Sequence, residues 1–180
     1  METIDMREAT VYLLRIPGAG ELPLSRRERE RKAVESIIRE VFGPEAALHH
    51  DDNGAPYLDG TATGTFISVS HSASTACVAV RNGSAVGVDI ETGRSQLRSV
   101  AARFLSPDEQ AIFTSDTALL TAWTSKEAAF KAASEPRLVI SDIRLSSDMT
   151  SAATPSGQKF ALHHRPFGDN SLITIAIPNA

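Results

Sequence analysis

Residues 86–91 read Val-Gly-Val-Asp-Ile-Glu, so apolar and acidic side chains alternate along this short stretch. An alternation with a period of two residues is typical of a strand that has one apolar and one polar face. Val88 and Ile90 are therefore predicted to point into a core, while Asp89 and Glu91 project side by side from the opposite face. Two neighbouring carboxylates can transfer protons or bind a cation.

A second stretch, residues 123–131, reads Trp-Thr-Ser-Lys-Glu-Ala-Ala-Phe-Lys. Leu119, Trp123, Glu127 and Lys131 are spaced four residues apart, which places them along one line of a helix. We expect Trp123 to be buried, so that Glu127 and Lys131 lie where the apolar stripe ends. An acid and a base are then held one helical turn apart at the edge of the core.

Each stretch taken alone is also typical of ordinary structure. An amphipathic strand often has an acidic, solvated face, and a Glu-Lys pair four residues apart is common on exposed helices. Taken together, Asp89, Glu91 and Glu127 supply three carboxylates that could converge. Mg²⁺ binds such oxygen ligands and completes its coordination shell with water and substrate phosphates. The two stretches together therefore favour a magnesium site for a phosphate-containing substrate.

The sequence around these residues resembles the Sfp-type 4′-phosphopantetheinyl transferase family. The resemblance rests on Gly-Val-Asp-Ile-Glu at residues 87–91, on Trp-x-x-Lys-Glu-Ala-x-x-Lys at residues 123–131, and on Val-Ser-His-Ser at residues 69–72. It covers residues 68–131 well and the remainder weakly. It implies an α+β fold with two pseudosymmetric halves, about 1–85 and 86–180 of a single domain. Each half would be a small antiparallel sheet packed on a long helix, with the active site between the halves.

The resemblance also implies a reaction and its site residues. A serine hydroxyl of an acyl or peptidyl carrier protein attacks the β-phosphorus of coenzyme A, which transfers 4′-phosphopantetheine and releases adenosine 3′,5′-bisphosphate. Mg²⁺, with Mn²⁺ as an alternative, would be held against the diphosphate by three carboxylates, while the other site residues contact its oxygens. Glu127 or a metal-bound water would accept the serine proton, and the sequence does not choose between them. The metal ligands implied are Asp89, Glu91 and Glu127; the catalytic residues are Glu127 and Lys131; the coenzyme A contacts are Ser70, His71 and Lys131.

One position departs from the family pattern. Ala55 stands where the family usually carries a lysine associated with the 3′-phosphate of coenzyme A, and the first half is shorter than expected. Two other functions therefore remain open: a non-catalytic paralogue that binds coenzyme A or a carrier protein, and another metal-dependent enzyme that cleaves a diphosphate.

Length and composition indicate an ordinary globular protein. The chain has 180 residues, of which 42% are hydrophobic and 22% charged. A net charge of −4 argues against binding to nucleic acid or an anionic membrane. The single cysteine, Cys77, lies in an apolar run and is expected to be a buried thiol in a reducing compartment. Without an apolar run long enough to span a membrane or a secretory leader, we expect a cytoplasmic monomer.

Local patterns predict the remaining elements. Ser25 and Glu28 form a capping box before a helix that ends at Gly43, and the Ser-Pro-Asp-Glu sequence at residues 106–109 begins another. The His-His-Asp-Asp sequence at residues 49–52 is expected in an exposed turn, with adjacent imidazoles pointing apart. Further strands are predicted at residues 10–16, 65–70, 75–81, 138–145, 159–164 and 171–177, with helical segments at 97–104 and 117–134 and a loop at 146–157.

A docking surface for the carrier protein is also predicted. Carrier proteins of this kind are acidic, as is this chain, so a local basic surface is needed for their encounter. Residues 92–104 contain three arginines and no acid, and Arg94 and Arg98 are four residues apart on a predicted helix. We expect this segment to contact the carrier.

Overall fold

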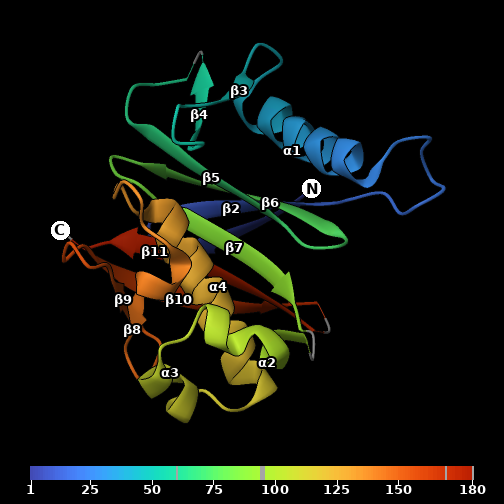
Figure 1. Cartoon of the computed structure of the whole chain (residues 1–180). Coiled ribbons are helices and arrows are strands. Elements are labelled where there is room, and N and C mark those ends of the chain that lie inside the picture. Colours follow the sequence, from blue (N-terminus) through green and yellow to red (C-terminus); the bar gives the residue numbers. More distant parts are fainter. Residues whose placement is uncertain (60, 94–95, 169, 180) are drawn as a thin grey trace.

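The computed structural model describes residues 1–59, 61–93, 96–168 and 170–179, and it contains two antiparallel sheets built from the two halves of the chain (Figure 1). The first sheet has the strand order β1-β2-β6-β5, and the second has the order β7-β11-β10-β9-β8. The strands of the first sheet are β1 (Glu2–Met6), β2 (Ala9–Arg15), β5 (Thr65–His71) and β6 (Thr75–Asn82). Those of the second are β7 (Gly87–Thr92), β8 (Arg144–Leu145), β9 (Ser151–Ala153), β10 (Lys159–Phe167) and β11 (Ser171–Pro178).

Two long helices accompany the sheets: α1 (Arg26–Phe42) follows β2, and α4 (Asp116–Ala132) follows β7. The predicted α+β fold of antiparallel sheets and helices is therefore confirmed. In each half, a strand that precedes the long helix pairs with the last strand of a later hairpin. These pairs are β2 with β6 and β7 with β11. A pseudo-twofold axis between the halves stays a prediction, as does the single-domain boundary.

The shorter elements fill the connections between the long ones. A separate hairpin, β3 (Ala47–His50) and β4 (Pro56–Asp59), follows α1. The short helical segments are α2 (Gln96–Val100), η1 (Ala101–Arg103), α3 (Pro107–Ile112) and η2 (Ile140–Asp142).

The main core lies between the two sheets. Alternate residues of β2, such as Val11, point inward and pack with Val88 of β7 and Ile175 of β11 in one cluster of buried side chains. Tyr12 and Leu14 point outward and pack with α1, and Ala176 packs with α4. The molecule thus has four layers, helix, sheet, sheet and helix, with α1 and α4 on opposite outer faces (Figure 1).

The predicted capping box before α1 is present, and the predicted helix start at residues 106–109 is a second capping box. Ser25 accepts a hydrogen bond from the backbone amide of Glu28, whose carboxylate in turn accepts from Ser25, and Ser106 and Glu109 make the same pair before α3. At the end of α1, Gly43 has a φ of 97°, a conformation that favours glycine.

The sequence prediction was wrong in several segments. Strand β1 was not predicted, and the apolar residues at 138–145 form η2 and the two-residue β8 instead of one strand. The backbone of this segment is held by side chains, because the Ile143 carbonyl accepts from Lys126 and the Leu145 amide donates to Glu109. The predicted loop at 146–157 contains β9, and the helical segment near residue 100 tightens into η1.

Burial agrees with the expectation for the cysteine. The Cys77 side chain is fully buried in the core between the sheets, and this burial raises the pKa of its thiol far above the ordinary value. Across the described ranges, none of the helices has the length and apolar character that a membrane crossing requires.

Candidate active site

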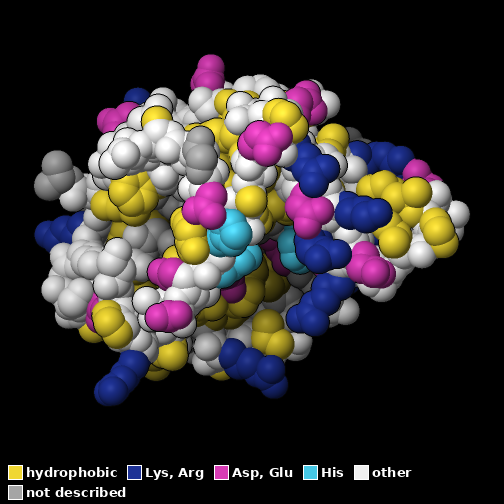
Figure 2. Space-filling view, turned by 90° about the horizontal axis from the view of Figure 1, so that it is seen from above, with side chains coloured by type: hydrophobic (Ala, Val, Ile, Leu, Met, Phe, Trp, Pro, Cys, Tyr) yellow, Lys and Arg dark blue, Asp and Glu magenta, His cyan; other side chains and the backbone are white. Residues whose placement is uncertain are grey.

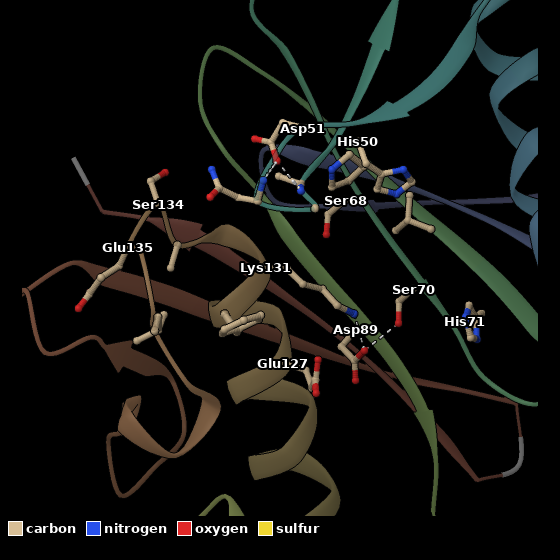
Figure 3. Close-up of a pocket in the computed structure, with 18 of the residues that line it drawn as sticks. His50, Asp51, Ser68, Ser70, His71, Asp89, Glu127, Lys131, Ser134 and Glu135 are labelled. Carbon is tan, nitrogen blue, oxygen red and sulfur yellow. Dashed lines mark hydrogen bonds and ion pairs between the residues drawn. The ribbon is translucent and has the colours of Figure 1, made fainter.

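All six site residues named from the sequence line one pocket of about 790 Å³. They are Ser70, His71, Asp89, Glu91, Glu127 and Lys131. The pocket walls come from β5, β7 and α4, from the turn that joins β3 to β4, and from the segment after α4 (Figure 3). Both halves of the chain therefore contribute to the same cavity.

Edge strands of the two sheets meet at this pocket. Ser68 and Ser70 lie two residues apart on β5, so their side chains share one face of the strand. Their hydroxyl oxygens accept hydrogen bonds from the amides of Val88 and Ile90 on the edge of β7, at 3.0 and 3.3 Å. Two buried serine side chains thus satisfy backbone donors that the second sheet leaves unpaired at its edge.

The Asp89 carboxylate is buried and has two donors on the same oxygen. Its Oδ1 accepts from the Ser70 hydroxyl at 2.7 Å and from Lys131 Nζ at 2.8 Å. The Lys131 ammonium also donates to the Val88 carbonyl at 3.0 Å. Asp89 on β7 is therefore linked to β5 through one bond and to α4 through the other (Figure 3).

Glu127 lies one helical turn before Lys131 and faces the same pocket. Burial raises the pKa of Glu127; the negative charges of Asp89 and Glu91 add to this effect, and the positive charge of Lys131 opposes it. Among the described residues, Glu127 makes no ion pair or hydrogen bond through its carboxylate. Glu127 is thus close enough to Asp89 and Glu91 for their charges to repel it.

A close contact between backbones sets the distance of α4 from β7. A Cβ atom at Gly87 would lie 1.8 Å from the Ala128 carbonyl oxygen and 2.8 Å from the Ala132 amide nitrogen. Only glycine allows this approach, and Ala128 and Ala132 are small, buried residues. Lys131 reaches Asp89 because the helix lies this near to the strand.

A buried ion pair fixes the other side of α4. Lys126 has no exposed surface, and its Nζ donates to Glu109 at 2.7 Å and to the Ile143 carbonyl at 2.6 Å. Although burial opposes ionisation of Glu109, hydrogen bonds from Lys126 and from the Ser106 and Leu145 amides lower its pKa. Sequence reasoning missed this pair, because a lysine inside the core is predicted only when its partner is known.

His71, the last residue of β5, lies at the rim of the pocket. Its side chain is 44% exposed, and its Nδ1 is 3.6 Å from Glu30 on α1. Glu30 is buried and also accepts from Arg26 at 2.6 Å. Arg26, a basic residue in the first turn of α1, is thus linked to His71 at the pocket rim by their shared contact with Glu30.

Trp123 differs from its prediction. It is only partly buried, packs edge-on against Phe104 with ring centroids 5.1 Å apart, and lines the pocket beside Glu127. It also lines a second, smaller hollow of about 260 Å³ with Gln96, Leu97 and Val100.

Several pocket residues were not predicted. Asp51 accepts hydrogen bonds from the Asn53 and Ala55 amides, and this bonded turn brings Ala55 to the pocket wall. Arg137 lines the pocket from the segment after α4 with a φ of 65°, a conformation uncommon for a residue other than glycine.

The two neighbouring histidines lie in different surroundings. His49 and His50 end β3, and the predicted exposed turn begins after them, at Asp51 and Asp52. His49 pairs with Asp59 and stacks on Tyr57, whereas His50 lines the pocket. Figure 2 shows histidine side chains at the edge of a hollow, with Lys and Arg side chains to one side of it.

The donor set fits a hard divalent cation in its chemistry. Asp89, Glu91 and Glu127 offer carboxylate oxygens to one cavity, and their mutual repulsion is what a cation would relieve. Within the described ranges, however, no three Asp, Glu, His or Cys side chains are already grouped as a metal site. Lys131 holds Asp89 in the arrangement seen here.

A comparison with known families agrees with this geometry. Residues 85–174 match the model of the 4′-phosphopantetheinyl transferase superfamily. The matched segment spans β7 to the first half of β11 and therefore includes Asp89, Glu91, Glu127 and Lys131. No curated protein matches the chain. Half of the sequence is matched, and Asp89, Glu91 and Glu127 of the matched segment line one pocket. This chain therefore belongs to the 4′-phosphopantetheinyl transferase superfamily.

Proposed function

We propose that this protein transfers 4′-phosphopantetheine from coenzyme A to a serine of an acyl or peptidyl carrier protein, as a holo-[acyl-carrier-protein] synthase type enzyme. The reaction depends on Mg²⁺ and releases adenosine 3′,5′-bisphosphate. The observation that carries the proposal is the convergence of motifs from both halves of the chain, Ser70 and His71 with Asp89, Glu91, Glu127 and Lys131, on one pocket.

Asp89, Glu91 and Glu127 would hold the metal ion in this proposal. When bound, Mg²⁺ neutralises the diphosphate oxygens and stabilises the negative charge that develops on the leaving phosphate. Lys131 and His71 bind the substrate, and Glu127 also accepts the proton.

Lys131 supplies the positive charge that pairs with Asp89. Its side chain is 25% exposed, so the ammonium can approach the phosphoryl oxygens from the pocket wall. His71 is the exposed donor at the rim and contacts the diphosphate there. Both groups strengthen their contacts as negative charge shifts toward the leaving phosphate.

The proton of the attacking serine passes to Glu127. Its carboxylate faces the pocket, where the serine of the carrier would enter. This assignment selects one of the two acceptors that the sequence left open.

Mass spectrometry of an apo carrier protein tests the proposal directly. After incubation with the protein, coenzyme A and Mg²⁺, we expect the carrier to gain one phosphopantetheinyl group and the solution to contain adenosine 3′,5′-bisphosphate. The Asp89→Asn variant, which keeps the size of the side chain, should lose this activity by orders of magnitude while remaining folded. A wild-type protein that binds coenzyme A but modifies none of the acyl and peptidyl carriers would instead favour a non-catalytic binding protein. Release of the bisphosphate without a carrier would indicate another diphosphate-cleaving enzyme.

A further inference from the structure

Ser70 occupies a position from which it can act on Asp89 or on a substrate, and its hydrogen bonds decide between the two. A serine hydroxyl has one hydrogen to donate and two lone pairs that accept. Its oxygen accepts from the Ile90 amide at 3.3 Å, and its hydrogen is directed at Asp89 Oδ1, 2.7 Å away. A diphosphate oxygen can only accept hydrogen bonds, so it would need the hydrogen that Ser70 already gives to Asp89.

The hydrogen bonds to Asp89 make its two carboxylate oxygens different from each other. Ser70 and Lys131 both donate to Oδ1, and one carboxylate oxygen offers about two lone-pair sites. No hydrogen bond or ion pair reaches Oδ2 from the residues that the structure describes. In Figure 3, Asp89 lies between Ser70 on one side and Glu127 on the other.

We propose that Ser70 is a positioning residue for the metal site: it orients the Asp89 carboxylate so that Oδ2 is available to a divalent cation together with Glu127. The inference rests on the proposed function for the presence of that cation. It assigns Ser70 a task different from the contact with coenzyme A that the family resemblance implied. It also makes β5 of the first half a support for the metal ligands of the second.

Ser68 provides a matched control two residues away. Both serines are buried, both line the pocket, and both accept an amide hydrogen bond from the edge of β7. Only Ser70 contacts Asp89. Replacing either serine by alanine removes the same kind of bond between the sheets, so a difference between the two variants reports the contact with Asp89.

The first measurement is the affinity for Mn²⁺ without coenzyme A, which the electron paramagnetic resonance signal of free Mn²⁺ reports. Loss of an outer partner of a metal ligand typically weakens metal binding about 10- to 100-fold, which we expect for Ser70→Ala. Ser68→Ala should bind Mn²⁺ as the wild type does, and Ser70→Thr, which keeps the hydroxyl, should restore binding. If Ser70→Ala fails to fold, Ser70→Cys preserves the side-chain volume with a weak donor and should show the same direction of change.

The second measurement is the affinity for coenzyme A in excess chelator, determined by calorimetry. A positioning role leaves this affinity unchanged in Ser70→Ala, because no ion is present for Asp89 to hold. Equal Mn²⁺ affinities of Ser70→Ala and Ser68→Ala would overturn the proposal, as would a loss of metal-free coenzyme A binding in Ser70→Ala alone. Neither result affects the proposed function, which fails only if the wild type does not modify a carrier protein.

Discussion

At the scale of single residues, Asp89, Glu91 and Glu127 line one pocket together with Lys131 and Arg137. Glu127 is the acid whose environment is least favourable to its charge, because burial, Asp89 and Glu91 all raise its pKa. The stability of the metal-free protein should therefore depend on pH through the ionisation of Glu127.

Glu127→Gln is expected to stabilise the metal-free protein near neutral pH. A carboxyl whose pKa is higher in the folded protein than in the unfolded chain destabilises the fold where it is ionised. The penalty is absent below the ordinary value of 4.5, grows as the pH rises through the raised pKa, and is complete above it. Thermal unfolding in chelator should therefore show a higher Tm for Glu127→Gln than for the wild type at pH 8 and equal values at pH 4. The exposed Glu45→Gln serves as the control, and a difference that does not depend on pH would contradict the assignment.

Lys131→Ala should reduce kcat more than it weakens coenzyme A binding. An interaction that strengthens in the transition state contributes to the rate and much less to ground-state affinity. Steady-state kinetics and calorimetry on the same preparation separate the two effects. If Lys131 were only a structural partner of Asp89, the variant would lose thermal stability while its kcat stayed unchanged.

Arg137 is a candidate for the basic group that Ala55 does not supply. It is a cation on the pocket wall, and its left-handed backbone is held against an energetic cost. We expect the wild type to prefer coenzyme A over dephospho-coenzyme A, and both Arg137→Ala and Arg137→Gly to lose most of that preference in kcat/KM. The glycine variant relieves the backbone strain, so equal losses in the two variants assign the effect to the guanidinium. An unchanged preference would exclude Arg137 from recognition of the 3′-phosphate.

At the scale of elements, the site depends on how closely α4 lies on β7. Gly87 allows the backbone contact, and the Lys126–Glu109 ion pair holds the opposite side of the helix, so Glu127 and Lys131 face the pocket. The capping box at Ser106 and Glu109 belongs to the same arrangement, because Glu109 also binds Lys126 and the Leu145 amide.

Gly87→Ala should be among the most damaging small substitutions in the chain. The added methyl group would lie 1.8 Å from a backbone oxygen that cannot move without shifting α4. Overpacking of this kind typically costs about 1–3 kcal/mol and occasionally more, and we expect a loss of about 3 kcal/mol in the free energy of unfolding. Denaturant unfolding measures it. The control is Gly83→Ala, where φ is 91° and the space is open, so that only backbone strain of about 1 kcal/mol is expected. A Gly87→Ala loss no larger than that of the control would contradict the close approach.

At the scale of the whole molecule, both halves line the pocket, and in the proposed reaction a carrier protein approaches its open side. Three residues of α2 line the smaller hollow together with Trp123, which also lines the pocket. We expect the carrier to dock on this side. Arg98 of α2 is 60% exposed and pairs with Asp116 at 2.7 Å, while Arg94 lies outside the described residues.

Reversing both charges, as Arg94→Glu with Arg98→Glu, should raise KM for the carrier and flatten its dependence on salt. Charges at the rim of an interface act mainly on the encounter of the partners, so coenzyme A affinity should not change. Arg39→Glu with Lys159→Glu changes the net charge by the same amount at exposed positions of other elements and should have little effect. A carrier KM that stays at the wild-type value at low salt would place the docking surface elsewhere.

The sequence by itself determined the features that depend on local periodicity and short-range bonds. The alternation around Asp89 and the four-residue spacing from Leu119 to Lys131 fix which side chains share a face, because strand and helix geometry repeat with known periods. The capping boxes before α1 and α3 are likewise complete within four residues.

Only the tertiary structure decided which of these faces meet. The contact of Ser70 with Asp89 spans 19 positions in the sequence, and that of Lys131 with Asp89 spans 42. Neither is encoded in a local pattern, since both arise where sheet edges and a helix pack together. The same holds for residues 138–145, whose apolar pattern predicted a strand: the buried Lys126 and Glu109 bind their backbone groups, and a side chain far away in sequence thereby overrides the local preference.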